Sequence, residues 1–142
     1  TQSTDTASKE IVSEMLNLLN SKEVWIDRTQ HDQIISITSH LPHLISTALV
    51  GVAKENYEIA EIMGMAAGGF DGATRLTRTN PEMIKDMYDT NSQNINLFLK
   101  HFIDELIDLM NLQDSDELIN YLNNSVEWRR ALSEKFGERP LS

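Results

Sequence analysis

Apolar residues recur along most of the chain at three- and four-residue intervals, the spacing of one face of an α-helix. A different pattern occurs at Val24-Trp25-Ile26, a β-branched and aromatic run between polar residues, which favours a short strand. Three prolines and six glycines interrupt the pattern, and the sequence predicts a mainly α-helical protein. The predicted helices cover residues 7–19, 29–54, 55–66, 71–77 and 80–112, and a last one ends near Phe136.

Two of these helices have unusual features. Pro42 falls inside the helix over residues 29–54, and a proline there removes one backbone hydrogen bond and clashes with the preceding turn. We therefore expect a kink between Thr38 and Pro42. Asn80-Pro81 is a strong helix start, and the helix that follows is about thirty residues long, beyond the usual globular range of about 8 to 20. Such a length indicates packing against a partner.

Charge and composition narrow the class of function. The 142 residues contain 12 Lys and Arg against 22 Asp and Glu, a formal net charge of −10. Nucleic acids and anionic membranes favour a basic surface, so we expect neither as a partner. The absence of cysteine excludes disulfides, cysteine zinc sites and thiol nucleophiles.

The sequence also bears on where in the cell the protein is expected. We expect the apolar stretches to fall short of the about 18 residues that a membrane span needs, and we find no export leader. These features favour a soluble, cytoplasmic protein. The chain begins at Thr1 rather than at a methionine, which we interpret as a fragment of a longer protein.

The first candidate site is a histidine cluster. His40 and His43 share a helix face close to Pro42, and His31 lies upstream next to Asp32. His31 is equally well explained as a helix-end residue that its neighbours hydrogen-bond. A metal site from these three histidines and Asp32 is an alternative because imidazole and carboxylate suit zinc or iron, but the spacing matches no standard ligand pattern.

The second candidate site is Gly68-Gly69-Phe70, followed by Thr74-Arg75. An arginine presents a planar fork of donors that suits a carboxylate. The glycines permit positive φ angles and a close approach of the backbone to a ligand. A small anionic ligand needs such a local cation on a chain with ten excess negative charges. The competing interpretation makes Arg75 an ion-pair partner within its helix.

These motifs resemble the C-terminal half of bacterial prephenate dehydrogenases. The resemblance is carried, in order, by His31-Asp32, Ser39-His40-Leu41-Pro42-His43, Ala67-Gly68-Gly69-Phe70 and Thr74-Arg75. Enzymes of this family convert prephenate to 4-hydroxyphenylpyruvate and carbon dioxide on the route to tyrosine, and they pass a hydride to NAD or NADP. They combine a Rossmann domain with an all-helical domain, similar to that of 6-phosphogluconate-dehydrogenase-like enzymes, through which two subunits intertwine.

The resemblance implies a domain division and a set of ligand contacts. Residues 1–27 would be the last helix and strand of a truncated nucleotide-binding domain, and residues 28–142 a helical dimerisation and substrate-binding domain that forms a homodimer. By motif matching, His43 and Arg75 would contact the carboxylates of prephenate or the inhibitor tyrosine. Four further residues would line the same pocket: Ser39, His40, Gly68 and Gly69.

The resemblance also implies what the chain lacks. The histidine that takes the proton from the ring hydroxyl belongs to the family's N-terminal domain, so we expect no catalytic residue here and no activity from the fragment alone. The glycines do not form a G-x-G-x-x-G motif after a strand, so NAD or NADP is expected only in the full-length protein. Asp71 and Gly72 depart from the basic and acidic residues that many relatives have after the glycines, and Ile84 stands where some have tryptophan.

Two other functions stay open from the sequence. One is a non-enzymatic helical module for dimerisation or tyrosine sensing. The other is a metal-dependent hydrolase built on the His31-Asp32 pair, although such a site needs an upstream histidine and none precedes His31. We interpret His101, among the apolar residues of the long helix, as structural.

Overall fold

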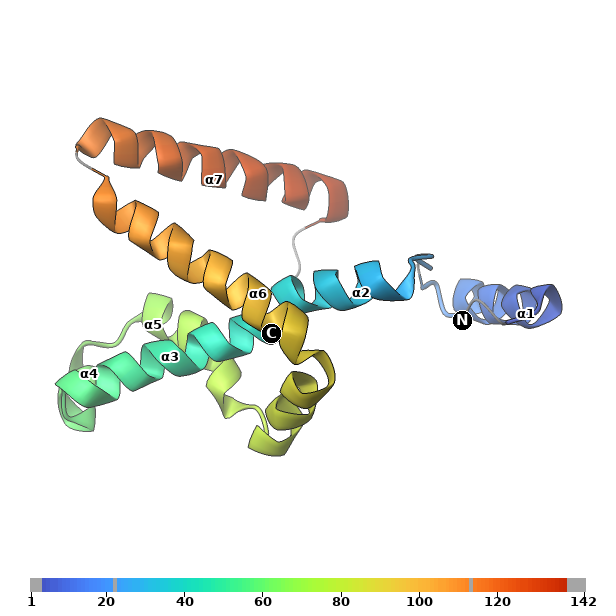
Figure 1. Cartoon of the computed structure of the whole chain (residues 1–142), viewed down its shortest axis with the longest axis horizontal. Coiled ribbons are helices and arrows are strands. Elements are labelled where there is room, and N and C mark those ends of the chain that lie inside the picture. The colour runs from blue at the N-terminus through green and yellow to red at the C-terminus, as the bar shows by residue number, and fades with distance from the viewer. Residues whose placement is uncertain (1–3, 22, 113, 138–142) are drawn as a thin grey trace. The chain divides into compact units, whose positions relative to one another are not determined.

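The computed structural model describes residues 4–21, 23–112 and 114–137, and all regular elements in these residues are helical (Figure 1). The prediction of a mainly α-helical protein is confirmed. Residues Thr1–Asn91 and Ser92–Ser142 form two compact units, which are described separately below. The elements are α1 (Thr6–Leu18), α2 (Arg28–Ile35), η1 (Ser36–His40), α3 (Leu41–Asn56), α4 (Ile59–Met65), α5 (Gly68–Thr74), η2 (Arg75–Arg78), α6 (Pro81–Asn111) and α7 (Ser115–Phe136).

The strand expected at Val24-Trp25-Ile26 is not present. These residues form a non-helical link between α1 and α2, in which the Trp25 ring centroid lies 5.9 Å from the ammonium nitrogen of Lys9. A strand exists only where a neighbouring strand completes its hydrogen bonds, and the described part of the chain contains no other strand. The β-propensity of the run therefore has no partner to act on.

Side-chain caps precede α6, whose start at Asn80-Pro81 the sequence predicted, and α7. The side chain of Asn80 accepts a hydrogen bond from the backbone N–H of Glu82 at 3.0 Å, ahead of α6. The carboxylate of Asp114 accepts from the N–H groups of Asp116 and Glu117 at 2.9 and 2.8 Å, ahead of α7. Each cap satisfies donors that have no partner inside the helix.

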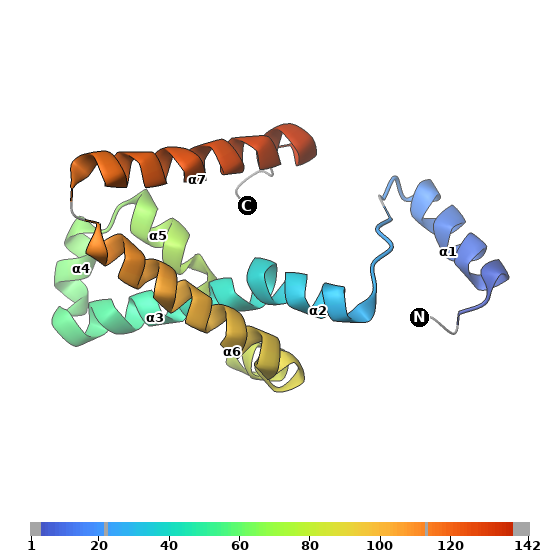
Figure 2. The ribbon, with the colours of Figure 1, turned by 45° about the horizontal axis from the view of Figure 1, so that its top comes forward.

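The kink predicted near Pro42 takes the form of a widened turn. The element η1 is a π-helix, and Pro42 lies in the first turn of α3, immediately after it. The N–H of Leu41 bonds to the carbonyl of Ser36, five residues back, where an α-helix would reach back only four. The helix thus continues past the proline without an abrupt break (Figures 1 and 2).

The helical stretch Arg28–Asn56, formed by α2, η1 and α3, is long and apolar enough to cross a membrane, with a mean hydropathy of 1.3 over an 18-residue window. The expectation that all apolar stretches fall short of that length does not hold for this segment. Core helices of soluble proteins have the same length and composition, and α3 packs against α5 and η2 within its unit.

Helix α3 is anchored to α5 by a buried side chain. The Ser46 hydroxyl, on a residue only 4% exposed, donates a hydrogen bond to the carbonyl of Ala73 at 2.6 Å. The next residue, Thr74, is also buried, and its hydroxyl donates to the carbonyl of Phe70 at 2.7 Å. The bond from Ser46 holds the end of α5, and with it the start of η2, against α3, whereas the bond from Thr74 lies within α5.

The long helix α6 has 31 residues, as the sequence predicted, but it is interrupted at Asn91. The backbone of Asn91 is non-helical, with φ of −139° and ψ of 25°. The interruption falls at the boundary between the two units.

Removal of the Ser46 hydroxyl should loosen the α3–α5 anchor. In Ser46→Ala the carbonyl of Ala73 loses this donor, so we expect the free energy of unfolding to fall by about 1 kcal/mol. The control is Thr47→Ala, since the exposed Thr47 hydroxyl bonds only to a carbonyl of its own helix; this change should stay within about 0.5 kcal/mol. Urea unfolding of both variants measures the difference, and equal losses would contradict the anchor.

Candidate functional site

The residues of the predicted histidine cluster lie on three consecutive elements. Ser39 and His40 belong to η1 and His43 to α3, and all three are half-buried. His31 lies on α2 and is exposed, with its Nδ1 atom 3.0 Å from a carboxylate oxygen of Asp32. His31 thus has the neighbour-bonded arrangement of a helix-end residue.

His43 has a buried ring nitrogen without a hydrogen-bond partner. Its Nδ1 atom is inaccessible to solvent, and none of the described residues bonds to it. Buried polar atoms in folded proteins are nearly always paired, so an exception points to a water or a ligand that completes the site. Among the described residues, this nitrogen is the one buried side-chain nitrogen or oxygen without a partner.

His40 is held by a residue that the sequence analysis missed. The side-chain nitrogen of Asn91 lies 2.8 Å from the carbonyl of Asp32, 2.8 Å from the hydroxyl of Ser36 and 3.5 Å from Nδ1 of His40. A signal was available in the sequence, because Asn91 lies midway between Met87 and Ile95 at the four-residue spacing of the apolar stripe. A polar residue in such a position needs a polar partner when the stripe is buried.

The environment of His40 lowers the pKa of its imidazole below the ordinary value of 6.5. Burial is the largest cause because it disfavours the charged ring, and the neighbouring His43 and His31 act in the same direction. The carboxylate of Asp32 opposes them. His40 is therefore neutral at physiological pH.

Arg75 is an exposed cation at the start of η2. No described carboxylate forms an ion pair with it, whereas Arg78 pairs with Asp71 at 3.2 Å. The ion pair of this segment is thus formed by Arg78, whose partner lies in the preceding helix. Because η2 packs against α3, the segment that carries Arg75 is attached to the helix that carries His43.

Gly68 and Gly69 are the first two residues of α5. The positive φ angles that a glycine permits are not used at these two positions, since among the described glycines only Gly137 has one. The backbone turns at Ala66 and Ala67, which are both extended, so the glycines themselves can be helical. No atom lies within 4 Å of the position that a Cβ atom would occupy on either glycine, which leaves the space for close approach that the sequence predicted.

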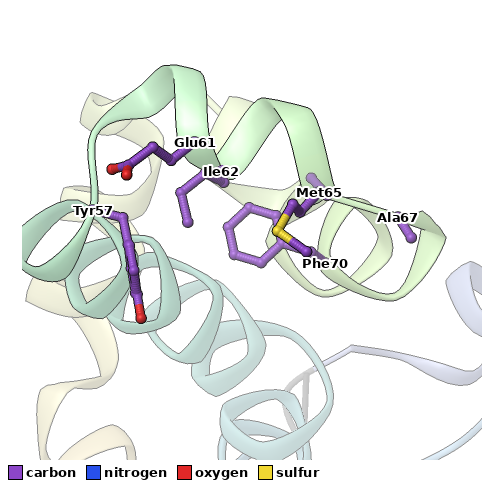
Figure 3. Close-up of a pocket in the computed structure, with 7 residues that line it drawn as sticks. Tyr57, Glu61, Ile62, Met65, Ala67 and Phe70 are labelled. Atoms are coloured by element: carbon purple, nitrogen blue, oxygen red, sulfur yellow. The ribbon is translucent and has the colours of Figure 1, made fainter.

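A cleft of about 450 Å³ lies directly before these glycines (Figure 3). Its walls come from the end of α3, from α4 and from the start of α5, and are mostly apolar. The six residues predicted to bind a ligand are not among those that line it. The lining residues are Tyr57, Glu61, Ile62, Met65, Ala66, Ala67 and Phe70.

The described glycines do not form the glycine loop of a dinucleotide site. A Rossmann site needs a glycine loop between a strand and a helix, and no strand precedes Gly64, Gly68 or Gly69 in the part that the structure describes. Nor do the described histidines, aspartates and glutamates gather in groups of three that could hold a metal ion.

Comparisons with known proteins agree with the fold and the motifs. The family described as "Prephenate dehydrogenase, dimerization domain" matches residues 27–124. Cyclohexadienyl dehydrogenase of Zymomonas mobilis is 34% identical over 115 residues, which are 78% of this chain and 39% of that protein. Prephenate dehydrogenase of Bacillus subtilis is 27% identical over 138 residues, which are 92% of this chain and 36% of that protein.

Solved structures show the same helical architecture. Synechocystis arogenate dehydrogenase matches with a TM-score of 0.78 at 26% identity, over 93% of this chain and 50% of that one. Prephenate dehydrogenase from A. aeolicus, in complex with hydroxyphenyl propionate and NAD+, matches with a TM-score of 0.81 at 24% identity, over 93% of this chain and 48% of that one. The chain thus spans about half of these structures and less than two fifths of the curated relatives.

The lowered pKa of His40 predicts a loss of stability in acid. The unfolded chain binds a proton near pH 6.5 while the folded chain resists it, so stability is full above that value and declines as the pH falls below it. His40→Gln should abolish this part of the decline, measured as the urea midpoint at about pH 7.5 and about pH 5.5. Gln33→Ala removes an exposed amide that does not titrate, so it is the control and should keep the wild-type pH dependence. Undiminished acid sensitivity in His40→Gln would contradict the assignment.

Proposed function

Because the chain belongs to the prephenate dehydrogenase family, we propose that it is the dimerisation and substrate-binding domain of an enzyme that oxidatively decarboxylates prephenate to 4-hydroxyphenylpyruvate with NAD or NADP. The match to the family's dimerization domain over residues 27–124 supports this assignment. The chain spans 36% to 39% of the curated relatives, so the complete enzyme includes parts that this chain lacks. We expect the chain alone to be inactive.

The observation that carries the proposal is an unpaired cation beside a helix with an unsatisfied histidine. Arg75 lacks an ion-pair partner among the described carboxylates, and the helix packed against its segment carries His43 with the buried, unbonded Nδ1. In the proposed site Arg75 binds a carboxylate of prephenate, or of the inhibitor tyrosine, through two parallel hydrogen bonds. His43 donates a further bond.

The other predicted residues shape the same site. Ser39 and His40 supply polar groups from η1, one turn before His43. Gly68 and Gly69 leave open space where side chains would otherwise stand, so a ligand can approach the backbone of α5. The proton transfer from the ring hydroxyl and the binding of NAD or NADP are functions of the nucleotide-binding domain, which supplies the hydride chemistry.

Residues 1–27 are the end of that nucleotide-binding domain in our proposal. The family match begins at residue 27, which supports the boundary. Helix α1 also has an apolar stripe that the described chain leaves uncovered, and a sheet would cover it. The exposed fractions are 60% for Ile11, 57% for Met15, 79% for Leu18 and 70% for Leu19.

The enzyme acts as a homodimer in the cytoplasm in this proposal. The C-terminal part of α6 exposes an apolar stripe at i, i+3, i+4 and i+7 spacing, formed by Ile103, Leu106, Ile107 and Met110. An exposed apolar stripe of this kind marks a surface that a partner covers. A second copy of the chain is the partner that the dimerization family supports.

The role of Arg75 is tested in the complete enzyme. Arg75→Ala should raise the KM for prephenate about 10- to 100-fold, because charge-assisted hydrogen bonds to a carboxylate are lost, and leave the KM for the nucleotide unchanged. Arg78→Ala is the control. It also removes one positive charge, but Arg78 is already paired with Asp71, so neither KM should change. Steady-state kinetics with each substrate varied in turn measure both. Unaltered prephenate kinetics in Arg75→Ala would refute the role.

The homodimer is tested by sedimentation of the complete enzyme. Ile107→Glu places a charge in the exposed stripe and should convert the dimer to a monomer at low micromolar concentration, because an unpaired charge in an apolar interface is costly to desolvate. Lys100→Gln, an exposed change on the same helix, lowers the net charge by the same amount and should leave the dimer intact. A wild-type protein that sediments as a folded monomer would contradict the proposal.

A further inference from the structure

Three hydrogen-bond acceptors converge on the side-chain nitrogen of Asn91. They are the carbonyl of Asp32 and the hydroxyl of Ser36, both at 2.8 Å, and Nδ1 of His40 at 3.5 Å. All of these residues belong to the unit Thr1–Asn91. The side chain therefore joins the interruption of α6 to the π turn that carries the proposed site.

The chemistry of the partners determines which end of the amide faces them. The carbonyl of Asp32 can only accept a hydrogen bond, so the NH₂ group of Asn91 must point toward it. The hydroxyl of Ser36 donates its own hydrogen to the same carbonyl at 2.8 Å, so these two oxygens lie side by side and share one N–H of Asn91, which leaves the second N–H for Nδ1 of His40. With the amide turned around, its oxygen would face the carbonyl oxygen of Asp32, which offers no hydrogen.

The same orientation determines the protonation of the His40 ring. The second N–H group of Asn91 faces Nδ1 of His40 at 3.5 Å, and this arrangement favours a lone pair over a proton on Nδ1. In a neutral imidazole the proton then resides on Nε2, at the other side of the ring. A protonated ring would direct a second N–H against the amide of Asn91.

We propose that Asn91 is a positioning residue that holds His40 as the neutral Nε2–H tautomer, so that the Nε2–H group is the donor offered to the bound acid. The part of the proposal that concerns the acid rests on the function proposed above. The tautomer itself depends only on the contacts of Asn91.

The charged groups around His40 are consistent with a neutral ring. Asp32 and His31 face it from α2 and His43 from α3, and Asn91 on α6 is uncharged. The carboxylate of Asp32 is shared with the ring of His31 at 3.0 Å and the guanidinium of Arg28 at 3.9 Å. The acid nearest to His40 thus has other cationic or donor partners.

The tautomer can be measured directly in the intact protein. With histidine labelled by ¹⁵N in the ring, NMR at neutral pH should give the Nε2–H pattern for His40. In Asn91→Ala the signals should become those of mixed tautomers, and the titration midpoint of His40 should rise. Gln93→Ala removes an exposed amide from the same helix and should change neither. The spectrum of the wild type alone can refute the proposal, because an Nδ1–H pattern for His40 would overturn it.

A second variant separates positioning from a merely structural role. Asn91→Asp replaces the donor with an acceptor that favours a proton on Nδ1, so the titration midpoint of His40 should rise above that of Asn91→Ala. Equal midpoints in wild type, Asn91→Ala and Asn91→Asp, in protein that is folded by circular dichroism, would overturn the proposal.

Kinetics of the complete enzyme test the link to the acid. Asn91→Ala should raise the KM for prephenate about 3- to 10-fold, the loss expected for one misplaced neutral donor, and leave kcat nearly unchanged. If the NMR results hold and the wild-type enzyme does not turn over prephenate, the proposed function fails and the positioning role stands. If prephenate is turned over and the tautomer is Nδ1–H, the positioning role alone fails.

Discussion

The proposed site depends on the inability of Pro42 to donate a backbone hydrogen bond. A proline inside a helix leaves a carbonyl one turn earlier without a donor, and its ring crowds the same place. The chain responds with the π turn Ser36–His40, in which Leu41 reaches back five residues to Ser36. Turns of this type occur frequently at functional sites because they change the direction of side chains within an otherwise regular helix. Here the turn carries Ser39 and His40 and is followed directly by His43.

Sequence reasoning succeeded where the cause of a structure is local. The helices, the helix start at Asn80-Pro81 and the distortion at Pro42 each depend on residues within about two turns, and all were predicted. One expectation depended on a more distant partner and was not met: Val24-Trp25-Ile26 has strand propensity but no neighbouring strand among the described residues.

The contact between Asn91 and the π turn was not predicted from the sequence. It joins residues 51 to 59 positions apart, and no local rule connects an asparagine in one helix to a serine in another. The single sequence signal was a polar residue at a position where the apolar stripe of the long helix required an apolar one. The ligand contacts of Arg75, His43 and the glycines stay predictions. They were inferred from the motif, and they depend on a bound acid as well as on the protein.

The charge of the chain explains why a neutral histidine suits the proposed site. The net charge of −10 opposes an anionic ligand over the whole surface, so attraction has to come from a local cation, and Arg75 is unpaired among the described carboxylates. A guanidinium keeps its positive charge at any physiological pH, whereas a histidine gains or loses its charge within the physiological pH range. With Arg75 providing the charge, the imidazole of His40 needs only to provide a directed N–H. A lowered pKa and an amide that fixes the tautomer are the conditions under which an imidazole does so without a change of charge.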